Sequence, residues 1–126
     1  MLNKRLILIP GKNARGGITN YYNSLEKHFT GKVIYLMRGS RNWPEKEKFI
    51  KKIYRIINDY FCFVLTVKSN KISLVQTTTA FYKQSIFRDA IYIIISKIFR
   101  KKTIVFFRGW NDNYVYNLDG ITRTII

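Results

Sequence analysis

Short apolar runs alternate with amphipathic segments along this chain, and this alternation limits the folds that the chain can adopt. Four largely apolar runs are typical of strands that are buried on both faces: residues 6–9, 33–37, 72–76 and 103–107. Between them, apolar residues recur at helical spacing in segments that begin near residues 18, 44 and 85. This order predicts an α/β fold, a Rossmann-like parallel sheet of about four strands with helices on both faces.

The middle helix is expected to be the longest. It should begin near Pro44 or Glu45, because proline and acidic residues are favoured in the first turn of a helix. Its apolar face is expected to hold Phe49, Ile53, Ile56, Ile57, Tyr60 and Val64, and its opposite face Lys48, Lys52, Arg55 and Asp59. No clear period remains after residue 110, so residues 1–110 form the predicted domain and residues 111–126 an irregular tail.

The chain is strongly basic, with a formal charge of +16 from 23 Lys and Arg residues against 7 Asp and Glu residues. Such an excess favours anionic partners, namely nucleic acid, an anionic lipid surface or phosphorylated substrates. The joint abundance of Lys, Ile, Asn and Tyr also fits the coding bias of an AT-rich genome, which would explain the charge without any partner.

The compartment is indicated by the single cysteine and by the length of the apolar runs. Cys62 alone allows neither a disulfide within the chain nor a thiolate metal cluster, and it fits a reducing cytoplasm. The longest apolar stretch, residues 90–95, falls far short of the roughly 18–20 residues that a transmembrane helix needs. We therefore expect a cytoplasmic protein, either soluble or peripheral at the inner face of the cell membrane.

Three segments should meet beyond the carboxyl ends of the strands, where open α/β sheets bind their ligands. They are residues 11–17, 77–81 and 108–110. In the first segment, Gly16 and Gly17 precede a helix whose free N–H groups favour an anion such as phosphate. The segment is not a Walker A loop, because Gly17 and Ile18 stand where that motif requires Lys and Ser or Thr. A plain tight turn that needs glycine is the alternative interpretation.

Among the ionisable residues, Arg108 is the main candidate for binding. With Gly109 after it, its forked donors could clamp a phosphate or a carboxylate, although it could equally be a solvated loop arginine. We expect His28 to be a surface or capping residue and Asp89 to cap or pair locally, while Asp112 is a weak candidate. No catalytic residue is identified, because no pair of carboxylates, no Ser/His/Asp set and no metal site stands out.

Taken in order, four segments resemble the N-terminal domain of family 4 glycosyltransferases of the GT-B class. They are Gly16-Gly17-Ile18-x-x-Tyr21-x-x-x-Leu25, Val75-Gln76-Thr77-Thr78-Thr79, Phe87-Arg88-Asp89-Ala90 and Thr103-Ile104-Val105-Phe106-Phe107-Arg108-Gly109-Trp110. The resemblance implies sugar transfer from a nucleotide-sugar donor to a glycan or lipid-linked acceptor, by a retaining mechanism without a metal or other cofactor. The substrate-binding residues that it implies are Gly16, Gly17, Thr77, Thr78, Arg108 and Gly109.

The resemblance also implies a second, donor-binding domain, which is absent from these residues. The chain is therefore expected to be the incomplete half of a GT-B fold, a fragment of an enzyme of polysaccharide biosynthesis that is inactive alone. The family often has histidine where Arg108 stands, so the role of that histidine does not carry over directly. The alternative is a small basic nucleic-acid-binding module, in which aromatic residues would stack on bases. Most aromatic residues, however, fall on apolar helix faces.

Overall fold

The computed structural model describes residues 4–11, 16–28, 33–39, 47–69, 71–109 and 112–113. Its elements, in chain order, are β1 (Lys4–Ile9), α1 (Gly17–Leu25), the 3₁₀ helix η1 (Glu26–His28), β2 (Val33–Met37), α2 (Phe49–Lys68), β3 (Ile72–Thr79), α3 (Lys83–Ile98) and β4 (Lys102–Phe107). The four strands form one sheet in the order β2-β1-β3-β4, and all three strand pairs are parallel. The predicted α/β fold with a four-stranded parallel sheet is confirmed.

Strand β1 lies at the centre of the sheet, paired with β2 on one side and β3 on the other. Leu6, Ile7 and Leu8 have no exposed surface, as expected for a strand that helices cover on both faces. The chain passes from β1 to β2 in one direction and then crosses back to β3 and β4. The carboxyl ends of β1 and β3 therefore form the topological switch point of the sheet.

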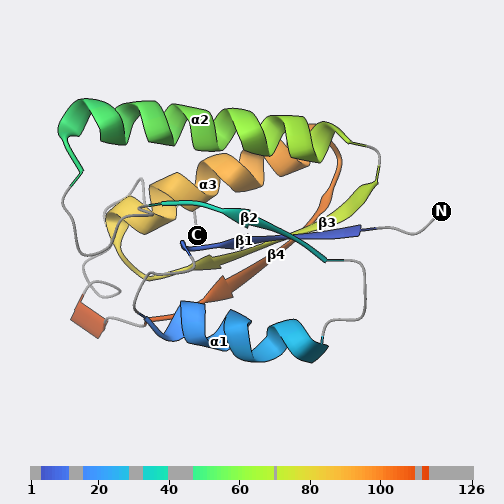
Figure 1. Ribbon diagram of the computed structural model, residues 1–126, viewed down its shortest axis with the longest axis horizontal. Coiled ribbons are helices and arrows are strands. Elements are labelled where there is room, and N and C mark those ends of the chain that lie inside the picture. Colours follow the sequence, from blue (N-terminus) through green and yellow to red (C-terminus); the bar gives the residue numbers. More distant parts are fainter. Residues whose placement is uncertain are drawn as a thin grey trace.

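Helices cover both faces of the sheet, as predicted. Helix α1 lies on one face, and α2 and α3 lie together on the other (Figure 1). Alternate residues of β1 consequently belong to two separate cores. The core beneath α2 and α3 contains Leu6, Leu8, Phe63, Val67, Ile72, Val75 and Tyr92, and the core beneath α1 contains Ile7, Ile9 and Tyr22.

Helix α2 differs from the prediction at its start and in its orientation. Pro44 and Glu45 lie outside the described residues, and the helix begins at Phe49, after an extended backbone at Lys48. The expected apolar face is right only in part, because Ile56, Tyr60 and Val64 are half-buried, whereas Phe49 is 76% exposed and Ile57 63%. Asp59 was expected on the opposite, polar face, but it is 4% exposed. The helix carries two apolar stripes. The stripe that faces the sheet contains Phe63 and Val67, which are fully buried and which the predicted face omitted.

Two other boundaries differ only slightly from the prediction. Strand β3 continues through Thr79, so the three threonines expected after the strand are part of it. The predicted tail, residues 111–126, lies outside the described residues except for 112–113.

Within the described ranges, no helix has both the length and the apolar character needed to cross a membrane.

Candidate functional site at the carboxyl edge of the sheet

The glycine pair stands at the first turn of α1, on the edge of the sheet where β1 ends. Gly16 is the N-cap of α1 and Gly17 its first residue, and both are exposed. A Cβ atom added to either glycine would meet no atom of the described residues within 4 Å. The first turn has neither a side-chain cap nor an acidic residue. This helix end thus has room for a ligand, and its N–H groups suit an anion.

Arg108 contacts this same helix from the end of the edge strand β4. It follows β4, and its guanidinium carbon lies 3.9 Å from the centroid of the Tyr21 ring, a cation–π contact with the second turn of α1. Its backbone N–H donates to the carbonyl of Thr79 at 2.7 Å. Gly109 then adopts a φ of 76°, a region that favours glycine, and its carbonyl accepts the N–H of Phe81. The structure therefore brings together Arg108 and the helix that begins at the glycine pair.

Thr77 and Thr78 are buried, with 0% and 2% of their surface exposed. The hydroxyl of Thr77 has no hydrogen-bond partner among the described residues. That of Thr78 lies 2.7 Å from the hydroxyl of Tyr22, which also accepts a hydrogen bond from the side-chain amide of Gln76 at 3.1 Å. The side chain of Thr78 thus links β3 to α1 through a hydrogen bond. Contact of Thr77 or Thr78 with a substrate stays a prediction.

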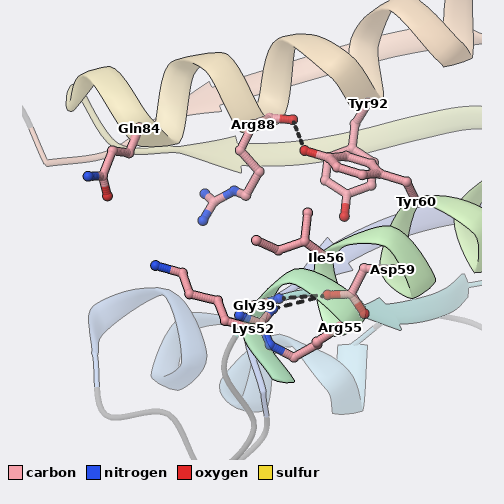
Figure 2. Close-up of a pocket in the computed structure, with 9 residues that line it drawn as sticks. All are labelled: Gly39, Lys52, Arg55, Ile56, Asp59, Tyr60, Gln84, Arg88 and Tyr92. Atoms are coloured by element: carbon pink, nitrogen blue, oxygen red, sulfur yellow. Dashed lines mark hydrogen bonds and ion pairs between the residues drawn. The ribbon is translucent and has the colours of Figure 1, made fainter. Parts of the chain in front are cut away.

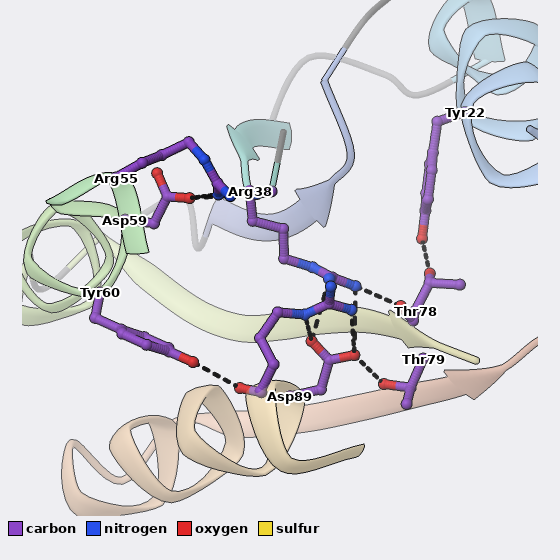
Figure 3. Close-up of polar contacts among 10 residues, drawn as sticks. Tyr22, Arg38, Arg55, Asp59, Tyr60, Thr78, Thr79 and Asp89 are labelled. Carbon is purple, nitrogen blue, oxygen red and sulfur yellow. Dashed lines mark hydrogen bonds and ion pairs between the residues drawn. The ribbon is translucent and has the colours of Figure 1, made fainter. Parts of the chain in front are cut away.

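A buried ion pair joins the ends of β2 and β3 to α3. Arg38, directly after β2, lies 3.2 Å from the carboxylate of Asp89, and the two side chains are 6% and 1% exposed. Asp89 also accepts a hydrogen bond from the Thr79 hydroxyl at 2.6 Å, and Arg38 donates to the carbonyl of Thr78. Figure 3 shows Arg38 and Asp89 pointing toward one another between these elements. Burial lowers the pKa of the Arg38 guanidinium, and the charge of Asp89 opposes that shift.

The sequence identified only part of this network. The local pairing expected for Asp89 is confirmed, because Arg88 donates to its carboxylate at 3.1 and 3.2 Å. Arg38 was not among the candidate residues, and its burial was missed. The available signal was its position immediately after a predicted strand, at the edge where the other candidate residues gather. Since Asp89 is saturated by three neighbours, we assign it to positioning rather than to acid–base chemistry.

The remaining candidates lie apart from this edge or on its surface. His28 is exposed on η1, as expected of a surface residue, and Asp112 is exposed as well. In the part of the chain that the structure describes, no three His, Cys, Asp or Glu side chains gather closely enough to hold a metal ion. Among the described residues, the groups available at the switch point are backbone N–H donors and Arg108, which suit the binding and orientation of an anion.

Comparisons with models of protein families, with curated proteins and with solved structures found no match for this chain. The fold and the geometry of this edge are therefore the observations from which its function is inferred.

Proposed function

We propose that the carboxyl edge of this sheet is one wall of a sugar-transfer site of the GT-B kind, where it binds the diphosphate of a nucleotide-sugar beside the acceptor. The observation that carries the proposal is the meeting of Arg108 with α1, the helix that begins at Gly16 and Gly17, at the switch point. A diphosphate matches these groups, because one phosphate can face the helix N-terminus while the guanidinium binds the other bidentately. In the GT-B class a second domain supplies the nucleotide site.

The strength expected of this wall alone is modest. A helix N-terminus contributes up to about 2 kcal/mol to anion binding. A hydrogen bond from a charged donor contributes about 1.5–3 kcal/mol. Together they give about 4 kcal/mol, which corresponds to a Kd on the order of 1 mM. Sugar transfer at useful rates would need the second wall to close the site, orient the substrates and exclude water.

Titration of the ¹⁵N-labelled chain with UDP-glucose, followed by NMR, tests this proposal. The amides of Gly16, Gly17 and Gly109 should shift with a common, saturable affinity in the millimolar range. Arg108→Gln should weaken binding by about tenfold or more, since it removes a charged donor. The matched control is Arg100→Gln, which makes the same charge change beyond the end of α3, at the opposite edge of the sheet. Equal effects of the two variants, or no saturable shift up to 10 mM, would contradict the proposal.

A lipid-linked acceptor at an anionic membrane is the second part of the proposal, and the outer face of α2 supports it. Exposed apolar residues follow one another at helical spacing along that face, namely Ile50, Ile53, Tyr54, Ile57, Phe61 and Leu65. Lys51 and Lys68 are also exposed on this helix, whereas its single carboxylate, Asp59, is 4% exposed. An apolar stripe with basic residues beside it is typical of helices that lie in a membrane interface.

Sedimentation with vesicles tests this second part. The chain should bind vesicles of phosphatidylglycerol more tightly than vesicles of phosphatidylcholine, and Ile57→Glu should reduce that binding strongly. Glu26→Gln, remote from α2 on η1, serves as a control for folding and general charge. Salt-sensitive binding to single-stranded RNA without binding to anionic vesicles would instead favour the nucleic-acid alternative.

A further inference from the structure

A pocket lies between α2 and α3, on the opposite face of the sheet from α1. Its volume is about 360 Å³, within the size range of small-molecule sites. Figure 2 shows the side chains of Lys52, Gln84 and Arg88 extending from the two helices toward the space between them. Ile56 and the buried Tyr92 line it farther along the helices, so polar donors stand at one end and apolar surface at the other.

The positive charge of this pocket is only partly compensated. Arg55 also lines it, but its guanidinium is engaged by Glu47 at 2.9 Å and by Asp59 at 3.3 Å. Lys52 is exposed and takes part in no ion pair among the described residues. Arg88 uses Nε and Nη2 on the Asp89 carboxylate, and within the described ranges its Nη1 donates to no other group. An ammonium and one guanidinium nitrogen therefore remain available to an anion.

Both helices present their positive ends near these donors. Neither α2 nor α3 has a side-chain cap at its N-terminus, and neither has an acidic residue in its first turn. Lys52 and Gln84 lie within the first turns of their helices. The positive ends of the two helix dipoles thus add to the potential that the side chains produce.

One carboxylate, Asp59, is among the described residues that line the pocket; it is 4% exposed and lies 3.3 Å from the guanidinium of Arg55, which compensates its charge. Burial raises the pKa of Tyr60 and of Tyr92, so both phenols remain neutral at physiological pH. The hydroxyl of Tyr60 donates to the carbonyl of Arg88 at 3.3 Å and so ties α2 to α3 beside the pocket. A ligand with a ring would lie against Ile56 and the tyrosines, with its charged group toward Lys52.

We propose that this pocket binds a small organic phosphate monoester. Lys52 and Nη1 of Arg88 hold the phosphate, and Gln84 donates its amide to the phosphate or to a neighbouring hydroxyl. This site lies apart from the one proposed for the nucleotide-sugar, because Arg108 and the glycine pair belong to the face of α1. The carboxylate of Asp89 joins Arg88 of the pocket to the buried Arg38.

NMR titration of the whole chain with glucose 1-phosphate tests the proposal, with inorganic phosphate and glucose as partial ligands. The amides of Lys52, Gln84 and Arg88 should shift together, and glucose alone should leave them unchanged. Lys52→Glu should weaken binding by at least about tenfold, the loss expected for one charged hydrogen bond. Lys51→Glu is the matched control, because it makes the same charge change in the same helical turn at an exposed residue that does not line the pocket. It should change the affinity less than twofold.

Dihexanoyl phosphatidic acid distinguishes a lipid headgroup from a soluble metabolite as the source of the phosphate. Tighter binding of this lipid at Lys52 and Arg88 would identify the headgroup, and tighter binding of glucose 1-phosphate the metabolite. Equal loss of affinity in Lys51→Glu and Lys52→Glu would overturn the proposal, because general electrostatics would then explain the binding. Shifts confined to Gly16, Gly17 and Gly109 would also overturn it, while leaving the nucleotide-sugar site supported.

Discussion

Replacing Asp89 with asparagine should destabilise this protein severely, because it would leave a buried guanidinium without its counter-charge. Arg38 is 6% exposed, and its carboxylate partner lies 3.2 Å away. Breaking a buried pair by removing one partner costs about 3–5 kcal/mol. A small domain has a free energy of unfolding of about 5–15 kcal/mol in total. The substitution therefore removes a large share of the stability. We expect the loss in free energy of unfolding to lie near the lower limit of that range, because Arg38 keeps its hydrogen bond to the carbonyl of Thr78.

Urea denaturation followed by circular dichroism measures this loss as a lower midpoint at an unchanged m-value. Arg88→Gln is the matched control, because Arg88 binds the same carboxylate but is 37% exposed. Solvent screens its pair with Asp89, so the control should cost no more than about 1 kcal/mol. Asp89→Asn combined with Arg38→Met should be more stable than Asp89→Asn alone, since the stranded charge is then gone. A loss below about 1 kcal/mol for Asp89→Asn, or one equal to that of Arg88→Gln, would refute this reasoning.

Two further predictions concern the core beneath α2 and α3. Phe63→Ala should lower the free energy of unfolding by about 3–5 kcal/mol, because Phe63 is wholly buried against Tyr92. Phe61→Ala, at a residue that is 61% exposed, should change it by less than about 0.5 kcal/mol. The urea midpoints of the two variants test this difference. Because burial raises the pKa of Tyr92 in the folded state above its ordinary value of about 10, its stabilising contribution is complete below pH 10 and is lost as the pH rises beyond it. Midpoints measured from pH 9 to pH 12 should therefore fall less steeply for Tyr92→Phe than for the parent chain, and parallel curves would be the contrary result.

The sheet could be predicted from the sequence because its signal is local. The runs that became β1, β2, β3 and β4 were recognised within a few residues of their observed ends, and alternation with helices specified parallel pairing. The orientation of α2 was not predictable in the same way. Both of its stripes are apolar, so the sequence pattern alone allowed either to face the sheet.

The candidate site was predictable where backbone chemistry defines it and not where distant side chains do. The glycine pair was recognised because it directly precedes an amphipathic helix, and Arg108 because it directly follows a strand. The ion pair of Arg38 with Asp89 joins residues 51 positions apart. The hydroxyl of Thr78 pairs with Tyr22 on one face of the sheet, and that of Thr79 with Asp89 on the other. Such partners become neighbours only once the topology is known, so no local pattern reveals them.

The central position of β1 has a consequence for how the protein is made. Among the four strands of the sheet, β1 is made first, yet β3, one of the two strands beside it, ends at Thr79, about 70 residues later. At a synthesis rate of roughly 5–20 residues per second, Leu6 and Leu8 wait about 4–14 s before that strand can cover their edge. Through that interval a nascent chain with this sequence displays an unpaired apolar strand, so its yield in a cell should depend on whatever shields β1 until residue 79 has emerged.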